Sequence, residues 1–290
     1  MKKITCAVDE TRELAPDETR AILDQDKKGE FLLLDVRQPE EYEAGHIPGA
    51  ILIPLDELEA RQKELDRSKK IIAYCRSGRR SMAAAIALCR LGFKDVYHVN
   101  GGILNWPYKT ISGMPAERPD LITEATDIKD ILMLGIKLEK GSWDFYMSAQ
   151  SRTELPQVRR TFQTLAKAED GHIKRLYERA MTLLGPGAFA PLEELKRQLK
   201  VEHMEGGIEI SPALAKVTER FIDEMEALEI ALEKEYMSYD FYERTSISLV
   251  NPDAKMLLHE LALEERKHAD TLLKHVAEIA RQGRLERRPR

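Results

Sequence analysis

Apolar positions follow two different periods along the chain, and the change between them predicts two domains. In the first part, short apolar runs at 31–36, 50–54, 71–74 and 95–99 are separated by polar segments and by a helical pattern at 79–91. Strands that alternate with helices in this way are typical of a parallel α/β domain.

The period changes after a stretch with little regularity at 107–121, which contains three prolines and one glycine. We predict a linker there, with domains at 1–115 and 120–285. Helical spacing then dominates and predicts four long helices, at 123–150, 156–184, 212–248 and 252–282. The long connection at 185–211 joins two helical hairpins, which favours a ferritin-like four-helix bundle over a simple up-down bundle.

The second part of the chain repeats itself. The segment LEKGSWDFY at 138–146 corresponds to KEYMSYDFY at 234–242, and LAKAEDGHIKRL at 165–176 corresponds to LALEERKHADTL at 261–272. Both pairs are 96 positions apart, across two predicted helices and the connection between them. An offset held over that distance indicates a duplicated helical hairpin.

Every predicted helix of the bundle carries a glutamate on its apolar face, and two helices add a histidine three residues later on the same side. The six residues are Glu139, Glu169, His172, Glu235, Glu265 and His268. Unpaired carboxylates are costly in a core, so four of them need cations. Two divalent ions supply four positive charges, and carboxylate-rich ligation with one imidazole per ion favours iron, or manganese, over zinc. A metal-free bundle with surface glutamates is the alternative.

On these motifs, residues 120–285 resemble the rubrerythrin branch of the ferritin-like superfamily. The resemblance implies that the six residues hold two iron ions, and that the centre reduces peroxide or dioxygen. It also implies that Tyr146 and Tyr242 lie near the metals, as neighbouring groups or redox partners. Ser238 stands where several members have a further carboxylate that takes part in a redox-linked ligand shift, and Ser142 matches it in the first helix.

A second candidate site follows the apolar run at 71–74, in the segment IIAYCRSGRRSMAAAI. Cys75 ends the predicted strand, a helix follows, and the loop between them is rich in arginine. The residues expected to bind substrate there are Arg76, Ser77, Gly78, Arg79 and Arg80. Backbone N–H groups and arginines around a thiol favour its thiolate, which makes it a nucleophile at neutral pH. Such a thiolate has two uses, taking sulfur from an anionic donor or attacking a phosphate.

Residues 1–115 resemble a single rhodanese domain, because the loop is bracketed by LLDVRQPEEYEAGHIPGAILIP and NGGILNW in the family order. Rhodaneses transfer sulfane sulfur through a persulfide on this cysteine, from thiosulfate or a persulfide to a thiol or cyanide. The loop has the six-residue length of that family, whereas related phosphatases have one residue more. We expect structural roles for Asp35, Arg37 and His46, and packing roles for Cys6 and Cys89.

Composition limits the partners and the compartment. A net charge of −5 gives no reason to expect nucleic acid or an anionic membrane. The first residues lack the apolar region of a signal peptide, and no run approaches the ~18 apolar residues of a membrane helix. Three cysteines without a CxxC pair fit a cytoplasmic protein, and they are too few for a rubredoxin site.

Together these features predict a bifunctional sulfur and redox protein. The rhodanese part transfers sulfur through a Cys75 persulfide, and the di-iron part acts on peroxide, dioxygen or a sulfur species with electrons from an external donor. The alternative is a persulfide carrier or sensor whose metal bundle is regulatory or iron-storing. Family resemblance also implies a homodimer.

Overall fold

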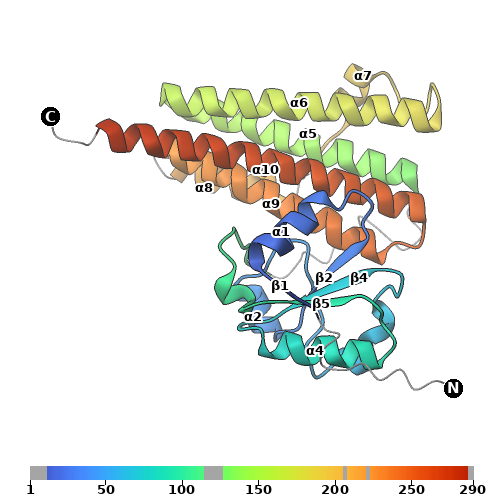
Figure 1. Cartoon of the computed structure of the whole chain (residues 1–290). Helices are drawn as coiled ribbons and strands as arrows, with labels where there is room; N and C mark the ends of the chain where they lie inside the picture. Colours follow the sequence, from blue (N-terminus) through green and yellow to red (C-terminus); the bar gives the residue numbers. More distant parts are fainter. Residues whose placement is uncertain (1–11, 114–126, 205–207, 220–222, 287–290) are drawn as a thin grey trace. The chain divides into compact units, whose positions relative to one another are not determined.

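A computed structural model of the chain describes residues 12–113, 127–204, 208–219 and 223–286. The chain forms two compact units, Met1–Pro115 and Ala116–Arg290 (Figure 1). Cys6 and much of the predicted linker lie outside the described residues, so the packing role of Cys6 stays a prediction. The predicted fold class, an α/β domain followed by a helical bundle, is confirmed.

A parallel sheet forms the centre of the first unit. Its strands are β1 (Arg12–Leu14), β2 (Phe31–Asp35), β3 (Ile51–Leu52), β4 (Lys70–Tyr74) and β5 (Val96–Val99). Their order is β1-β5-β4-β2-β3, and every neighbouring pair is parallel. Because β4 is central, the residue that follows it lies at the middle of the carboxyl edge of the sheet.

Helices cover both faces of this sheet (Figure 1). They are α1 (Pro16–Gln25), α2 (Pro39–Ala44), α3 (Leu58–Arg61) and α4 (Arg79–Arg90). Alternate residues of β4 belong to two separate apolar cores, as the two-residue period of a strand requires. Ile71 and Ala73 pack in the core under α3 and α4. Ile72 and Tyr74 pack in the core that includes residues of α1 and α2.

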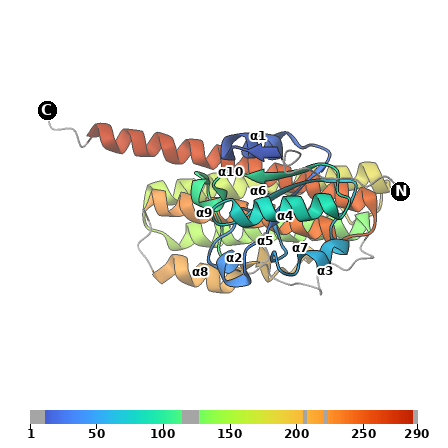
Figure 2. The ribbon, with the colours of Figure 1, turned by 60° about the horizontal axis from the view of Figure 1, so that its bottom comes forward.

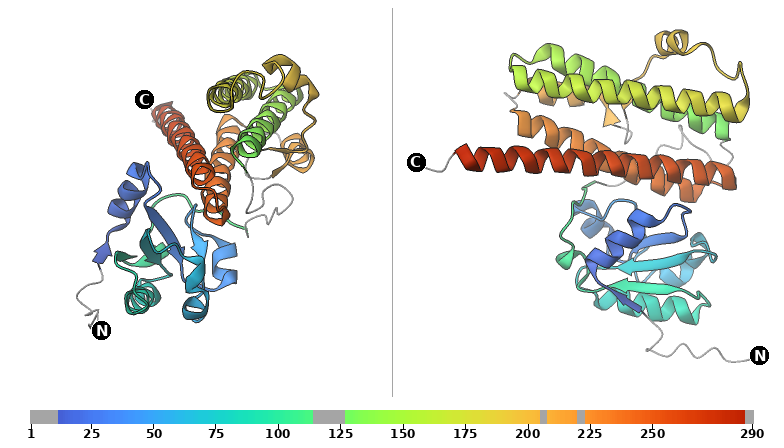
Figure 3. Two further views of the ribbon diagram at one scale, coloured as in Figure 1. Left: turned by 90° about the vertical axis from the view of Figure 1, so that its right-hand side faces the viewer. Right: turned by 45° about the horizontal axis from the view of Figure 1, so that its top comes forward.

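Four long helices form the second unit. They are α5 (Ile128–Arg152), α6 (Pro156–Leu184), α9 (Glu224–Ser248) and α10 (Pro252–Glu286). The pairs α5–α6 and α9–α10 each run side by side as a hairpin, and the two hairpins pack against each other (Figure 3). The amino-terminal half of α10 covers α9, and its other end extends beyond the bundle (Figure 2).

The connection between the hairpins contains short elements. They are α7 (Leu192–Gln198), β6 (His203–Met204), β7 (Ile208–Glu209) and α8 (Ile210–Glu219). Strands β6 and β7 pair antiparallel. The backbone at His203 lies so close to α5 that a Cβ at Gly141 would be 2.1 Å from its carbonyl oxygen. Glycine at that position therefore lets the connection dock on the bundle.

The predicted third helix, at 212–248, is wrong at its start. The structure has two helices there, and α9 begins after an N-cap at Asp223. The carboxylate of Asp223 accepts a hydrogen bond from the Glu226 N–H at 2.9 Å, and the Glu226 side chain accepts one from the Asp223 N–H at 3.1 Å. This capping box starts a new helix inside a stretch that apolar periodicity reads as continuous. Strand β1, helix α1 and the β6–β7 pair were also not predicted from the sequence.

No helix among the described residues is both long enough and apolar enough to cross a membrane.

Candidate functional site

Cys75 directly follows β4, and a short loop leads from it to the first turn of α4. The backbone N–H of Gly78 lies 3.2 Å from the Cys75 sulfur. Gly78 has a φ of +88°, a conformation that L side chains rarely adopt, and α4 begins at the next residue. The sulfur therefore sits among backbone donors at a helix N-terminus, the environment expected for an anionic sulfur.

The polar groups around Cys75 favour its thiolate. Burial raises the pKa of the Cys75 thiol, but hydrogen bonds from the backbone and hydroxyl of Ser81 and from the N–H groups of Ser77 and Gly78 outweigh that effect. The pKa is consequently lowered from the ordinary 9.0. A lowered pKa increases the fraction of thiolate at neutral pH, which is the form that attacks sulfur.

A second glycine-rich turn is hydrogen-bonded to the backbone of the Cys75 loop. The short helix η3 (Gly102–Asn105) donates the Ile103 N–H to the Cys75 carbonyl at 2.8 Å and the Leu104 N–H to the Arg76 carbonyl at 3.1 Å. Gly102 has a φ of +59°, and a Cβ there would lie 2.2 Å from the Cys75 carbonyl oxygen. The NGG motif thus allows the close backbone approach that holds the thiol-bearing loop.

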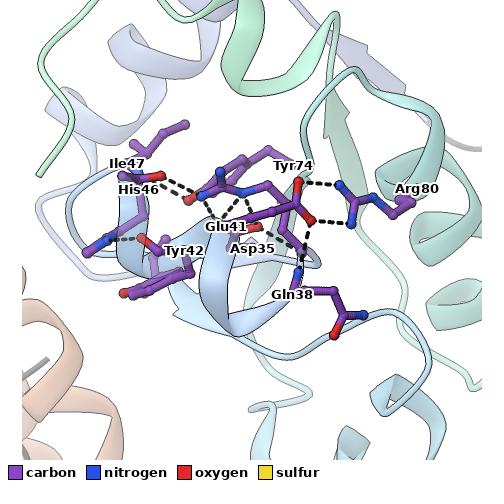
Figure 4. A network of polar contacts seen from close by, with 11 residues as sticks. Asp35, Gln38, Glu41, Tyr42, His46, Ile47, Tyr74 and Arg80 are labelled. Carbon is purple, nitrogen blue, oxygen red and sulfur yellow. Dashed lines mark hydrogen bonds and ion pairs between the residues drawn. The ribbon is translucent and has the colours of Figure 1, made fainter. Parts of the chain in front are cut away.

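The three arginines of the loop have different surroundings. Arg80 forms a two-pronged pair with Glu41 of α2, at 2.6 and 2.7 Å (Figure 4). The Arg80 hydrogen bond lowers the pKa of Glu41 to about 2. Arg76 and Arg79 are exposed beside the cysteine. Arg80 interacts with both Glu41 and the Cys75 sulfur, and these interactions raise its pKa, so this side chain links the loop to α2.

Asp35 and His46 belong to a buried polar network (Figure 4), and Arg37 is bonded to Asp35. The Arg37 guanidinium pairs with the Asp35 carboxylate at 2.6 Å and also donates to the Gly45 carbonyl at 2.8 Å. The His46 ring stacks on Tyr42 at a centroid distance of 3.7 Å. These contacts fit the structural roles expected from the sequence. Cys89 is a buried free cysteine in the core under α4.

The six predicted metal ligands come together in the bundle as two groups of three. Glu139, Glu169 and His172 form one group, and ligand atoms within it lie within 4.8 Å of one another. His172 Nδ1 lies 3.2 Å from an oxygen of each glutamate. These side chains come from α5 and α6, where the Glu-x-x-His spacing points both residues of α6 the same way.

Glu235, Glu265 and His268 form the second group, contributed by α9 and α10. His268 Nδ1 lies 3.5 Å from an oxygen of each glutamate. The imidazole rings of His172 and His268 stack, with centroids 3.9 Å apart, so the two groups are adjacent. The 96-residue repeat therefore produces a pair of matching triads in one core.

The donor atoms of both triads suit a pair of cations. The four carboxylates are each no more than 3% exposed. Within the described part of the chain, the buried Oε2 atoms of Glu169 and Glu235 and the Nδ1 atom of His268 make no hydrogen bond. Buried carboxylate oxygens and imidazole nitrogens without a hydrogen-bond partner are suitable ligands for divalent ions of the iron or manganese type.

Lys234 is a feature of this core that the sequence analysis missed. It is 2% exposed, and its Nζ lies 2.7 Å from Glu169 Oε1 and 3.4 Å from Glu235 Oε1. Burial raises the pKa of both glutamates, but the ammonium of Lys234 and the neighbouring histidine together outweigh it, so both pKa values are below the ordinary 4.5. Helix α9 carries several other charged residues, so no feature of the sequence marked this lysine as buried.

Ser238 and the two tyrosines occupy the core near these triads. The Ser238 hydroxyl donates to the Lys234 carbonyl at 2.9 Å, so it is bonded to its own helix. Tyr146 and Tyr242 are buried, and the Tyr146 ring centroid lies 5.4 Å from Lys234 Nζ. Tyr146 therefore borders the metal-ligand cluster through Lys234, while Tyr242 packs in an apolar core with residues of α5 and α10.

Comparisons with known proteins agree with this two-part architecture. The rubrerythrin family model matches residues 130–276, and a rhodanese-like domain model matches residues 15–108. The chain belongs to the rubrerythrin family, and it carries a rhodanese-like domain in front of the bundle. A rubrerythrin domain implies a di-iron site, and the two triads are the groups that could hold it.

Individual relatives share about a third of the chain. A thiosulfate sulfurtransferase, GlpE of Pseudomonas syringae, is 32% identical over 108 residues, which are 36% of this chain and 98% of that protein. A sulfurtransferase of Allochromatium vinosum is 34% identical over 31% of this chain and 82% of its own length.

The HTH-type transcriptional regulator Rv0324 of Mycobacterium tuberculosis is 43% identical over 34% of this chain and 43% of its own length. The chain spans between 42% and 59% of the length of this regulator and two further relatives, so it shares only a part with each.

Proposed function

We propose that the protein is a bifunctional sulfur and redox enzyme, with a sulfurtransferase site at Cys75 and a di-iron centre in the bundle. The observation that carries the first activity is the Cys75 sulfur held by the Gly78 N–H at a helix N-terminus. The paired Glu-Glu-His triads carry the second. Sulfurtransferase relatives and the rubrerythrin family match support both assignments.

In the sulfur transfer, the Cys75 thiolate attacks the outer sulfur of thiosulfate. A new S–S bond forms at Cys75, the S–S bond of thiosulfate breaks, and sulfite leaves with the electron pair. An acceptor thiolate or cyanide then takes the outer sulfur and restores the thiolate. The exposed side chains of Arg76, Ser77 and Arg79 bind the anionic donor, and the Arg80–Glu41 pair holds the loop open around it.

In the bundle, Glu139, Glu169 and His172 would hold one iron ion, and Glu235, Glu265 and His268 the other. Bound iron supplies electron transfer to peroxide, dioxygen or an oxidised sulfur species. The protein contributes a dry core, and the buried rings of Tyr146 and Tyr242 limit access of water to it. Manganese suits the same donors. Electrons come from an external donor, and two copies of the chain form a dimer in this proposal.

A second candidate is a persulfide carrier or sensor whose bundle regulates the sulfur site or stores iron. The similarity to a transcriptional regulator over 101 residues favours this reading, because it joins a similar segment to a control function. Turnover separates the two candidates. An enzyme passes sulfur from thiosulfate to cyanide repeatedly, whereas a sensor keeps a single sulfur atom.

The sulfur site is tested by mass spectrometry after treatment with thiosulfate. We expect one added sulfur atom on the peptide that contains Cys75, and loss of thiosulfate–cyanide turnover in Cys75→Ser with the fold and metal content unchanged. Cys89→Ser is the matched control, because that thiol is buried in the core away from the loop. Sulfur found on Cys6 or Cys89 alone would refute the assignment.

The metal site is tested by elemental analysis after anaerobic, metal-replete expression. We expect two ions of iron or manganese per chain. Glu139→Ala or Glu235→Ala should each weaken binding, and the double variant should lose most of it, because each triad then lacks a carboxylate. Wild-type protein that contains neither metal would contradict the di-metal proposal.

A further inference from the structure

Two lysines are buried in the described part of the bundle, and they have different surroundings. Lys140 pairs with Asp144 one turn further along its own helix, at 2.6 Å. Lys234 instead reaches across to Glu169 of α6, and it lies beside the adjacent Glu235. An ammonium therefore stands inside the cluster of carboxylates that the proposed di-metal function needs.

The lysine and the histidines contact different oxygens of the same carboxylates. In Glu169, Oε1 faces Lys234 at 2.7 Å, while Oε2 lies 3.2 Å from His172. In Glu235, Oε1 faces Lys234 at 3.4 Å, while Oε2 lies 3.5 Å from His268. In each triad, one carboxylate therefore directs one oxygen to the lysine and the other oxygen to the histidine, and a metal ion would bind on the histidine side.

The repeat of the hairpin does not extend to this lysine. The position 96 residues before Lys234 is Leu138, which is buried in an apolar core with Tyr242. In the other half of the repeat, Lys234 contacts the ring of Tyr146, which is the counterpart of Tyr242. The two halves therefore supply matching ligands but a single ammonium, so the charge at the centre is asymmetric.

Charge counting gives the consequence. Four ionised carboxylates and one ammonium leave a net charge of −3, and a first divalent ion brings it to −1. A second divalent ion brings it to +1, whereas without the lysine the same two steps end at zero. The ammonium repels each incoming ion, so the lysine weakens the binding of both ions and leaves the loaded site with one uncompensated positive charge.

We propose that Lys234 is a resident cation of the centre, which holds one carboxylate of each triad and weakens the binding of both metal ions. Lys234 is a positioning residue here and not a ligand. This inference rests on the proposed di-metal function, because it concerns the same carboxylates. It predicts that loss of the lysine charge tightens metal binding and destabilises the metal-free protein.

The test is a calorimetric titration of the metal-free full-length protein with Mn²⁺, with bound metal counted by elemental analysis. Wild type should bind two Mn²⁺ ions per chain. Lys234→Met removes the ammonium at similar side-chain length, and it should tighten the binding of each ion by about tenfold or more. Lys140→Met is the matched control and should titrate as wild type.

Thermal unfolding supplies a second measurement. Metal-free Lys234→Met should have a lower Tm than wild type, because four buried carboxylates lose their cation, and Mn²⁺ should raise its Tm more than it raises that of wild type. Lys234→Gln serves if the Met variant does not fold.

The outcomes separate this inference from the proposed function. A wild-type protein that binds no Mn²⁺ and no Fe²⁺ refutes the di-metal function and the role of Lys234 together. The same Mn²⁺ affinity with and without the Lys234 charge refutes only the role of Lys234. An equal change in Lys140→Met also refutes it, since the effect would then not come from the cluster.

Discussion

Reactivity at Cys75 depends on a small number of hydrogen bonds, of which those from Ser81 lower the thiol pKa most. We expect Ser81→Ala to raise the Cys75 pKa, because loss of a donor disfavours the thiolate more than the thiol. The pH profile of the rate of alkylation by iodoacetamide should then shift to higher pH. The rate at pH 7 should fall by up to about tenfold for a pKa change of one unit. Alkylation rates measured from pH 5 to 10 give both values.

The matched control is Ser77→Ala. The side chain of Ser77 is exposed, and its effect on the Cys75 pKa comes through the backbone N–H, which alanine keeps. Its profile should therefore coincide with that of wild type. A Ser81→Ala profile that also coincides with wild type would show that the hydroxyl does not stabilise the thiolate.

Single residues also show what the sequence could predict about the sites. The position of Cys75 and the convergence of the six proposed metal ligands were predictable, because local spacing places them at a strand end or on one face of a helix. The burial of Lys234 was not predictable, since a charged residue next to Glu235 is expected on the solvent-exposed side of the helix. The Arg80–Glu41 pair joins residues 39 positions apart, so it depends on how α2 packs beside the loop.

At the scale of elements, the connection between the hairpins depends on its contact with α5. Gly141→Ala would place a Cβ 2.1 Å from the His203 carbonyl oxygen, and the rigid backbone on both sides cannot give way easily. We expect a loss of about 1–3 kcal/mol in the free energy of unfolding, as for other overpacked sites. Urea denaturation of the metal-free protein measures it.

Gly171→Ala is the contrasting change in the same bundle. A Cβ at Gly171 would approach only the end of the Arg175 side chain, at 3.6 Å, and the residue lies within α6. Alanine there should stabilise the protein by about 0.5–1 kcal/mol, since glycine costs a helix interior that amount. If both alanines had the same effect, the close approach of β6 to α5 would not be what requires Gly141.

Element boundaries were harder to predict than element types. The long helices follow from apolar spacing that continues for many turns. The division between α8 and α9 does not, because the apolar period continues through it and the break depends on the capping box of Asp223 and Glu226. The two-residue strands β6 and β7 are too short to show a period, and docking on Gly141 helps to hold them.

At the scale of the whole molecule, one chain carries a sulfurtransferase-like loop and a pair of triads that could bind metal ions. The sequence predicted the two fold classes, because each part keeps its own apolar period. The residue bounds of the two domains stay predictions. Fusion places both sites at equal concentration in the cell, which favours joint use of sulfur and metal chemistry whatever the distance between them.

We predict that sulfur on Cys75 supplies electrons to the oxidised centre. One persulfide on Cys75 and one on a small thiol can join through a new S–S bond and release two protons and two electrons, the number that two trivalent iron ions accept. In single-turnover experiments with iron-loaded protein and a persulfide donor, the visible absorption of the oxidised centre should therefore fade faster in wild type than in Cys75→Ser. Cys89→Ser, which keeps the loop thiol, should match wild type. Equal rates in wild type and Cys75→Ser would mean that the metal centre does not use Cys75, and that the two activities share a chain without sharing a reaction.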